Sequence, residues 1–168
     1  MRKQVFKNRG KVALYTRTGR SCSRRLPGLV EAFRSVPARS CIIDGELVAG
    51  NDIWSLHRAM RERDYEQICV VGFDCLHLNG RDLRALAWTE RSARLQRLIT
   101  QASLAELLAL EHFGDGDRLL AAAEKLGIEG IVSKRRSEPY RSGRHSCWTK
   151  MKCPTWREKN RERWRLFV

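Results

Sequence analysis

The sequence lacks any Cys-x-x-Cys pair, although six cysteines are scattered along its 168 residues. Zinc ribbons and dithiol redox centres both need closely spaced pairs, so the sequence supports neither class. The four histidines also share no ligand spacing. We therefore expect most of the thiols to be small buried side chains in a reducing cytosol, and the histidines to be surface or hydrogen-bonded residues.

No apolar run is long enough to cross a bilayer, and Met1 is followed by charged residues rather than by the apolar segment of a secretory leader. Repeats, low-complexity segments and linkers rich in Pro, Gly or Ser are missing too. A chain of 168 residues with 42% hydrophobic side chains is long enough for one domain with a core. These absences predict a single cytoplasmic unit with no membrane partner.

Acidic residues are scarce at the two ends of the chain. Residues 1–25 carry nine lysines and arginines and no acid, and residues 134–168 carry twelve against three acids, whereas the middle is net negative. The formal charge is +14 and the pI about 10.2. Such a charge favours a polyanionic partner, nucleic acid first. A simpler alternative is that the basic ends are solvated tails.

The spacing of apolar residues predicts a mixed α+β unit built on antiparallel sheet. Strands are expected at residues 5–6, 12–16, 41–49, 68–78, 128–134 and 148–153, with an Asn-Arg-Gly turn between the first two. Helices are expected from Pro27, over 54–63, from a Thr89 cap, and from an Asp117 cap to Lys125. The run 68–78 is almost wholly apolar, which is typical of a strand buried on both faces.

Acidic side chains interrupt these apolar strands at several places. Asp44 and Glu46 lie in Ile-Ile-Asp-Gly-Glu-Leu-Val, Asp74 in Val-Gly-Phe-Asp-Cys-Leu, and Glu129 in Gly-Ile-Glu-Gly-Ile-Val. Carboxylates rarely enter a core unless they are paired or bind metal. Each motif alone is a weak signal, because an Asp-Gly-Glu triplet is more often an ordinary turn.

Two lysines alternate in Trp-Thr-Lys-Met-Lys-Cys, so on a strand Lys150 and Lys152 point to the same face. Paired cations of this kind suit phosphate oxygens, and carboxylates suit a divalent metal. Together they are the groups that phosphoryl or nucleotidyl transfer requires, since that chemistry depends largely on positioning and charge neutralisation. A solvated strand face is the alternative for the lysines alone.

Five motifs in this order resemble the successive nucleotidyltransferase motifs of ATP-dependent DNA ligases. They are Tyr-Thr-Arg-Thr-Gly (15–19), Asp-Gly-Glu-Leu (44–47), Phe-Asp-Cys-Leu (73–76), Glu-Gly-Ile-Val-Ser-Lys-Arg (129–135) and Trp-Thr-Lys-Met-Lys-Cys (148–153). The stretches at 78–84 and 140–144 further resemble the bacterial ligases of non-homologous end joining. The resemblance implies an ATP-grasp-like adenylation domain with antiparallel sheets flanked by helices, which joins DNA nicks or ends by AMP transfer in DNA repair and recombination.

The same resemblance implies roles for individual residues around ATP. Arg2 takes the place of the arginine in the first family motif, and Arg17 would contact phosphate of the nucleotide or the DNA. Glu46 would meet the ribose or a metal. Phe73 would stack on adenine, with plain core packing as its alternative. Asp74 would be either a metal-facing acid or a buried hydrogen-bonding residue.

Metal, phosphate and DNA contacts complete these expectations. Glu129, with Glu46, would hold Mg²⁺, and Lys150 and Lys152 would be catalytic residues that hold the α-phosphate. DNA, as a nicked or broken duplex, is the expected partner. Its expected contacts are Arg17, Arg20, Arg24, Arg141 and Arg144.

The family's nucleophilic lysine lies in a Lys-x-Asp-Gly motif that residues 1–168 do not contain. Counting back from Arg17 places that motif immediately upstream of Met1. We expect residues 1–153 to be a partial adenylation domain, incomplete at its N-terminus. Residues 154–168 would begin the connection to an OB-fold domain, and other end-joining proteins are candidate partners.

Two other functional interpretations stay open. A degenerate remnant that binds nucleotide or DNA without catalysis would show the same motifs. RNA ligases and mRNA-capping guanylyltransferases share the lysine chemistry, but the sequence around their motifs fits this chain less well.

Overall fold

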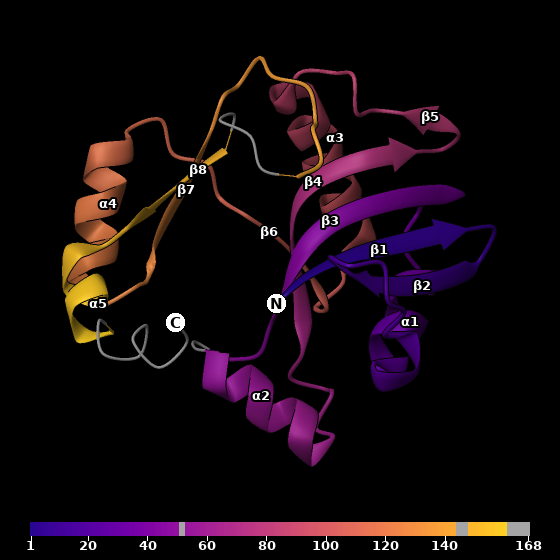
Figure 1. Ribbon diagram of the computed structural model, residues 1–168. Coiled ribbons are helices and arrows are strands. Elements are labelled where there is room, and N and C mark those ends of the chain that lie inside the picture. The colour runs from indigo at the N-terminus through magenta and orange to yellow at the C-terminus, as the bar shows by residue number, and fades with distance from the viewer. Residues whose placement is uncertain (51–52, 144–147, 161–168) are drawn as a thin grey trace.

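The computed structural model describes residues 1–50, 53–143 and 148–160, and its larger sheet has the strand order β2-β1-β3-β4-β5 with β6 beside β4 (Figure 1). The strands are β1 (Arg2–Asn8), β2 (Lys11–Thr16), β3 (Ser40–Val48), β4 (Cys69–Leu78), β5 (Arg81–Asp82) and β6 (Leu107–Ala109). Neighbours are antiparallel except β4 and β6, which run parallel. The expected antiparallel sheet is therefore confirmed apart from this one pair.

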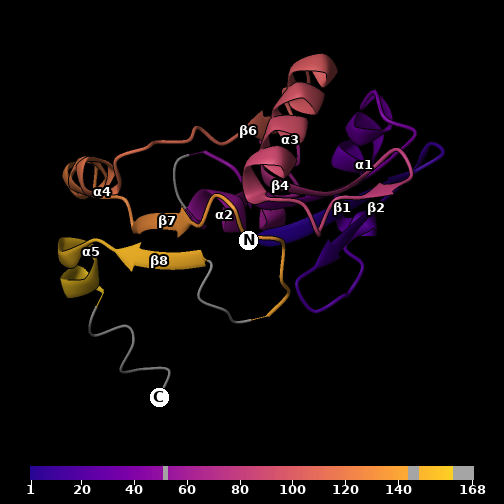
Figure 2. The ribbon, with the colours of Figure 1, turned by 90° about the horizontal axis from the view of Figure 1, so that it is seen from above.

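A second, two-stranded sheet pairs β7 (Gly130–Lys134) with β8 (Trp148–Lys152). The helices are α1 (Pro27–Arg34), α2 (Ile53–Glu62), α3 (Trp88–Ala102), α4 (Gly116–Lys125) and α5 (Pro154–Lys159), with a 3₁₀ turn at Ser23–Arg25. Both ribbon views place the small sheet beside the large one, next to α4 and α5 (Figures 1 and 2). The molecule is thus α+β, as predicted.

The β1–β2 hairpin forms because its turn residues accept left-handed backbone angles. Arg9 has φ +46° and Gly10 φ +80°, and Asn8 faces Lys11 across the ladder. Two consecutive positive φ values match the twist of a two-residue hairpin turn. The predicted Asn-Arg-Gly turn is confirmed.

The larger sheet has a core face and an open face, set by the alternation of side chains along β1 and β3. On the core face Val5 and Ile43 are fully buried in the apolar cluster that also contains Phe33 of α1 and Leu95 of α3. In the view from above, α1 and α3 lie on one side of the sheet (Figure 2). The open face carries the alternate residues of β1 and β3. Across the ladder these residues pair as Arg2–Glu46, Gln4–Asp44, Phe6–Ile42 and Asn8–Ser40.

Strand β4 is not buried on both faces, which corrects the expectation drawn from its apolar run. Val70 is fully buried, whereas Val71, Phe73 and His77 are only half-buried. The physical reason is that helices cover only the core face of this sheet. The open-face side chains of β4 are therefore less deeply buried than those on its core face.

The helix starts also differ from the predicted caps. Thr89 already lies in the first turn of α3, where its backbone N–H donates to the carbonyl of Arg136 (3.2 Å), so the helix begins after Ala87. In α4 the capping side chain is Asp115, which accepts from the N–H of Arg118 at 3.0 Å, and Asp117 lies in the first turn. Either acid favours a helix N-terminus, so sequence spacing alone did not separate them.

The thiols behave as predicted wherever the structure describes them. Cys22, Cys41, Cys75 and Cys153 are buried and Cys69 is half-buried, all unpaired; the sixth cysteine, at position 147, lies outside the described residues. Among the helices of the described segments, none combines the length and apolarity that a bilayer span needs.

Two histidines hydrogen-bond to serines, as expected of satisfied residues. The Nε2 atom of His77 lies 3.2 Å from Ser40 Oγ, and that of His112 lies 2.8 Å from Ser92 Oγ. Burial lowers the pKa of His112, with the nearby positive charge of Lys134 acting in the same direction. The histidine at position 145 lies outside the described residues.

Candidate functional site

Asp44, fully buried in β3, is neutralised by Arg2 of the neighbouring strand. Nε and Nη2 of Arg2 donate to its two carboxylate oxygens at 3.0 and 2.5 Å, and the hydroxyl of Tyr140 donates to Oδ2 at 3.1 Å. Arg2 faces Glu46 in the register, so Asp44 is its diagonal neighbour on the open face. The hydrogen bond with Asp44 raises the pKa of Arg2, which keeps the guanidinium charged.

Asp74 in β4 is the second fully buried acid, and its partner is Arg91 of α3, which is also fully buried. Nε and Nη2 of Arg91 donate to the two oxygens of Asp74 at 2.8 and 2.9 Å, and Nη1 donates to the carbonyls of Leu86 and Glu138. Of the two expected roles for Asp74, the buried hydrogen-bonding residue is the one that this geometry supports. The pair fixes the segment before Tyr140 against the larger sheet.

The ring of Phe73 lies among aromatic and cationic groups, outside the buried apolar cluster. Trp148 of β8 meets it edge-on with the ring centroids 5.8 Å apart. The guanidinium carbon of Arg2 lies 5.5 Å from its centroid, and the Nζ atom of Lys134 4.7 Å. Phe73 is half-buried here, and its ring contacts residues of both sheets.

Lys134, the last residue of β7, is the site residue for which the sequence predicted no role. Its Nζ donates to the carbonyl of Phe73 at 3.0 Å and lies 4.2 Å from the ring centroid of Trp148. Burial lowers the pKa of Lys134 to about 8, against the opposing attraction of Asp74 and Asp44. The only sequence signal was its place at the end of Glu-Gly-Ile-Val-Ser-Lys.

Glu129 and the two lysines of β8 form one cluster on the small sheet. The Oε1 atom of Glu129 lies 2.7 Å from Nζ of Lys150 and 3.2 Å from Nζ of Lys152. Burial acts to raise the pKa of Glu129, but the hydrogen bonds and charges of the lysines outweigh it, so the pKa is lowered. The predicted alternation is confirmed, because both lysines reach the same carboxylate from one face.

Gly130 makes this cluster possible by letting β7 and β8 approach closely. A Cβ atom at Gly130 would lie 2.0 Å from the carbonyl oxygen of Met151 and 2.7 Å from Cα of Lys152. Next to it, the N–H of Cys153 donates to the carbonyl of Glu129 at 3.0 Å. Only glycine fits this position, which explains the Glu-Gly pair in the motif.

Glu46 and Arg17 lie at the same end of the larger sheet as Arg2. Glu46, with 47% of its side chain exposed, pairs with the amino group of Met1. Arg17 directly follows β2, whose last residue, Thr16, faces Lys3 of β1. Arg17 is exposed and forms no ion pair within the described part of the chain.

The arginines expected to contact DNA are spread over two loops. Arg20 and Arg24 are exposed beside Arg17, between β2 and α1, and Arg141 is exposed in the segment that follows Tyr140. The position of Arg144 lies outside the described residues. The structure therefore places the first three between β2 and α1, and Arg141 between β7 and β8.

Mg²⁺ would have to be held by few protein ligands. No cluster of three or more His, Cys, Asp or Glu side chains suited to a metal occurs among residues 1–50, 53–143 and 148–160. Mg²⁺ typically uses one or two carboxylates together with substrate phosphates and water. Glu129, which is 40% exposed, and Glu46 are donors of this kind, so they fit a cation that arrives with a nucleotide.

Fold and site together define a nucleotidyltransferase-type domain: two adjoining sheets, an aromatic ring flanked by cations, and paired lysines on the smaller sheet. Residues 1–152 match the family model described as "ATP dependent DNA ligase domain". The chain belongs to the ATP-dependent DNA ligase family.

Individual relatives agree with this assignment. The multifunctional non-homologous end joining protein LigD of Pseudomonas aeruginosa is 38% identical over 150 residues, which is 86% of this chain and 18% of that protein. A probable DNA ligase of Nocardioides sp. is 32% identical over 90% of the chain and 31% of its own length. The chain thus spans about a fifth to a third of these relatives.

Solved structures confirm the expected fold. The ligase domain of LigD from M. tuberculosis matches with a TM-score of 0.74 at 29% identity, and a mycobacterial DNA ligase D complexed with ATP and MES with 0.73, also at 29%. Each match covers 90% of this chain and 50% of the other chain.

Proposed function

We propose that this chain is the part of an ATP-dependent DNA ligase that binds ATP, transfers AMP and joins nicks or ends in duplex DNA during repair. The observation that carries the proposal is the combination of the Phe73 ring, flanked by Arg2 and Lys134, with the Lys150–Lys152 pair on the adjoining sheet. Aromatic and cationic groups placed in this way suit a purine base and its phosphates. A DNA substrate is also consistent with the charge of +14.

Three group transfers make up the proposed reaction. A lysine amine attacks the α-phosphate of ATP and pyrophosphate leaves; the AMP then passes to a 5′-phosphate at the break, and the 3′-hydroxyl displaces it. Lys150 and Lys152 would hold the α-phosphate and offset its charge in each step. Mg²⁺, held by Glu129 and Glu46, would neutralise the remaining phosphate oxygens when bound.

None of the motif residues assigned above is the lysine that attacks ATP in the first step. Residues 1–168 contain no Lys-x-Asp-Gly, and Lys3 and Lys7, the first two lysines of the chain, point to the core face. Nζ of Lys7 donates to the carbonyl of Val36 at 2.6 Å. We therefore expect the 168-residue chain alone not to become adenylylated, yet to seal DNA that already carries the adenylate.

The experiment incubates the purified chain with α-labelled ATP and Mg²⁺, and in parallel with nicked duplex carrying a preformed 5′-adenylate. Sealing of the second substrate without labelling of the protein supports the proposal, provided that Lys150→Ala abolishes sealing and Lys125→Ala, on the exposed end of α4, does not. A protein label stable to alkali and labile to acid would identify a substitute lysine. If neither label nor sealing is seen, the non-catalytic remnant replaces the ligase as the interpretation.

The Glu129 cluster further predicts that nucleotide and metal bind cooperatively. Without nucleotide, Lys150 and Lys152 both occupy Glu129 Oε1. A phosphate that takes the lysines would release the carboxylate for a cation. Titration calorimetry should therefore find weaker Mg²⁺ binding without nucleotide than with it, and equal affinity in both states would show that Glu129 is not the ligand.

A further inference from the structure

The turn end of the larger sheet carries cations that the proposed chemistry does not use. Arg9 lies in the β1–β2 turn, Lys11 begins β2, Arg39 precedes β3 and Arg81 begins β5. We call these four exposed residues the basic sheet end. In the described chain none of them forms an ion pair, whereas Arg84, three residues beyond Arg81, pairs with Asp82.

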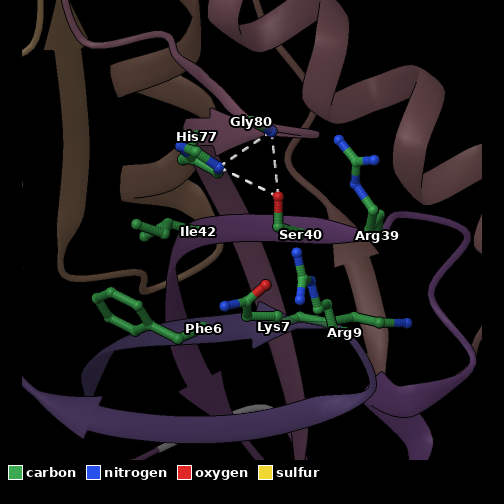
Figure 3. Close-up of a pocket in the computed structure, with 9 residues that line it drawn as sticks. Phe6, Lys7, Arg9, Arg39, Ser40, Ile42, His77 and Gly80 are labelled. Carbon is green, nitrogen blue, oxygen red and sulfur yellow. Dashed lines mark hydrogen bonds between the residues drawn. The ribbon is translucent and has the colours of Figure 1, made fainter.

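Two of the four cations border an open cavity of about 460 Å³ on the open face of the sheet. Figure 3 shows Arg9 and Arg39 beside Ser40, with Ile42 and His77 in the wall. This volume lies within the range of about 300–1,000 Å³ that is usual for ligand sites. Arg9 and Arg39 give its rim positive charge, whereas Phe6 and Ile42 form an apolar part of its wall.

The backbone around the cavity is held in place before any ligand arrives. The N–H of Arg9 donates to the carbonyl of Arg39 at 2.8 Å, and the N–H of Arg39 donates to Asn79 Oδ1 at 2.8 Å. The N–H of Gly80 donates to Ser40 Oγ (3.1 Å) and to His77 Nε2 (3.2 Å). The backbone at both arginines is therefore anchored, which lowers the part of the ordering cost that comes from the backbone.

The cavity and the candidate nucleotide site share one face of the sheet at opposite ends of β1. Phe6 and Asn8 line the cavity. Because side chains alternate between the two faces of a strand, they lie on the same face of β1 as Arg2. The six residue steps from Arg2 to Asn8 span about 20 Å at about 3.3 Å per residue. At about 3.4 Å per base pair, this is about six base pairs of duplex.

We propose that the basic sheet end binds the phosphate backbone of the DNA duplex about six base pairs from the break. The inference rests on the proposed function, because it assumes that the reacting phosphates lie near Phe73 and Lys150. Phosphate contacts of this kind fix the register of the protein on the duplex without reading its sequence. The surface would hold one arm of the broken DNA in line with the site.

The test measures binding of the full chain to a fluorescent nicked duplex by anisotropy, over a range of salt concentrations. The variant is Arg9→Asn with Arg39→Ser, and asparagine suits the left-handed turn position. The matched control is Arg97→Ser with Arg118→Ser, two exposed arginines on α3 and α4 that form no ion pair in the described chain. Equal melting temperatures of all three proteins establish that the folds are intact.

Two lost phosphate contacts should lower the slope of log K against log salt by about 1.8, and weaken binding at least about fivefold at 0.1 M salt. The control pair should keep the wild-type slope. Shortening one arm of the duplex to about four cross-linked base pairs should remove the difference between variant and wild type. Shortening the other arm should leave it.

Each other result has a defined meaning. A wild-type chain that does not bind nicked duplex at all contradicts the proposed function. If the wild type binds and the Arg9–Arg39 variant keeps the same salt slope, only the proposal that the basic sheet end binds DNA is wrong. If poly-glutamate of matched charge competes as well as duplex DNA, the surface binds anions generally and the DNA assignment is wrong.

Discussion

Replacing Arg91 by methionine should be among the most destabilising single changes in this protein. Both Arg91 and Asp74 are fully buried, and four hydrogen bonds from the guanidinium are satisfied inside the molecule. Methionine fills a similar length of apolar space but leaves the Asp74 carboxylate without a counter-charge. Breaking one side of a buried ion pair costs about 3–5 kcal/mol.

The double replacement Arg91→Met with Asp74→Leu separates the ion pair from the other two hydrogen bonds. Without the buried charge, the remaining loss is the unpaired carbonyls of Leu86 and Glu138, roughly 1–3 kcal/mol each if no water reaches them. The double variant should then be no less stable than Arg91→Met alone. Arg94→Met, on the same helix, removes only an exposed pair with Glu90 and should cost about 0.5 kcal/mol or less.

Urea unfolding followed by circular dichroism measures these differences, provided that the m-value does not change. For a domain of this size, 3–5 kcal/mol corresponds to a fall in melting temperature of very roughly 6–20 °C. An Arg91→Met protein within about 1 kcal/mol of wild type would refute the reasoning. It would mean that Asp74 takes up a proton or reaches water when its partner is removed.

Gly130→Ala should force β7 and β8 apart, because its Cβ would lie 2.0 Å from the carbonyl oxygen of Met151. We expect the free energy of unfolding, measured with urea, to fall by about 2 kcal/mol or more, and nucleotide binding to weaken. The pKa of Lys134 is lowered to about 8 in the folded chain, from 10.5. Between these two pH values the unfolded chain therefore binds more protons than the folded chain. The free energy of unfolding of the wild type should then rise with pH in that window, relative to that of Lys134→Met. Parallel pH profiles of the two proteins would contradict the assignment. Tyr140→Phe removes one hydrogen bond to Asp44 and should cost about 1 kcal/mol by urea unfolding, and a change below about 0.3 kcal/mol would show that Arg2 alone satisfies the carboxylate.

Local patterns in the sequence predicted the elements well, because hairpin turns and side-chain alternation depend on residues close together in the chain. The Asn-Arg-Gly turn, the strand containing Asp44 and the shared face of Lys150 and Lys152 all follow from spacings of a few residues. The β4 strand was described less well, since the number of helix-covered faces depends on the whole sheet.

The partners of the buried acids were beyond sequence reasoning. Arg2 is 42 residues from Asp44, and Arg91 is 17 residues from Asp74 on a different element. Spacing carries no information about such pairs, since they form only when strand order and helix packing are fixed. The sequence could say only that each buried acid needs a partner or a metal.

Lys134 shows how burial can hide a functional group from sequence analysis. In the printed sequence it is one of three consecutive basic residues, Lys134 to Arg136, which is the usual appearance of a solvated segment. In the fold, β7 ends against the larger sheet, and the amine lies within 4.2–5.6 Å of the ring centroids of Phe73, Trp88 and Trp148. Its two basic neighbours remain exposed. The chemical difference between Lys134 and its neighbours therefore arises from the contact between the two sheets, and any change that separates the sheets should return the pKa of this lysine towards its ordinary value.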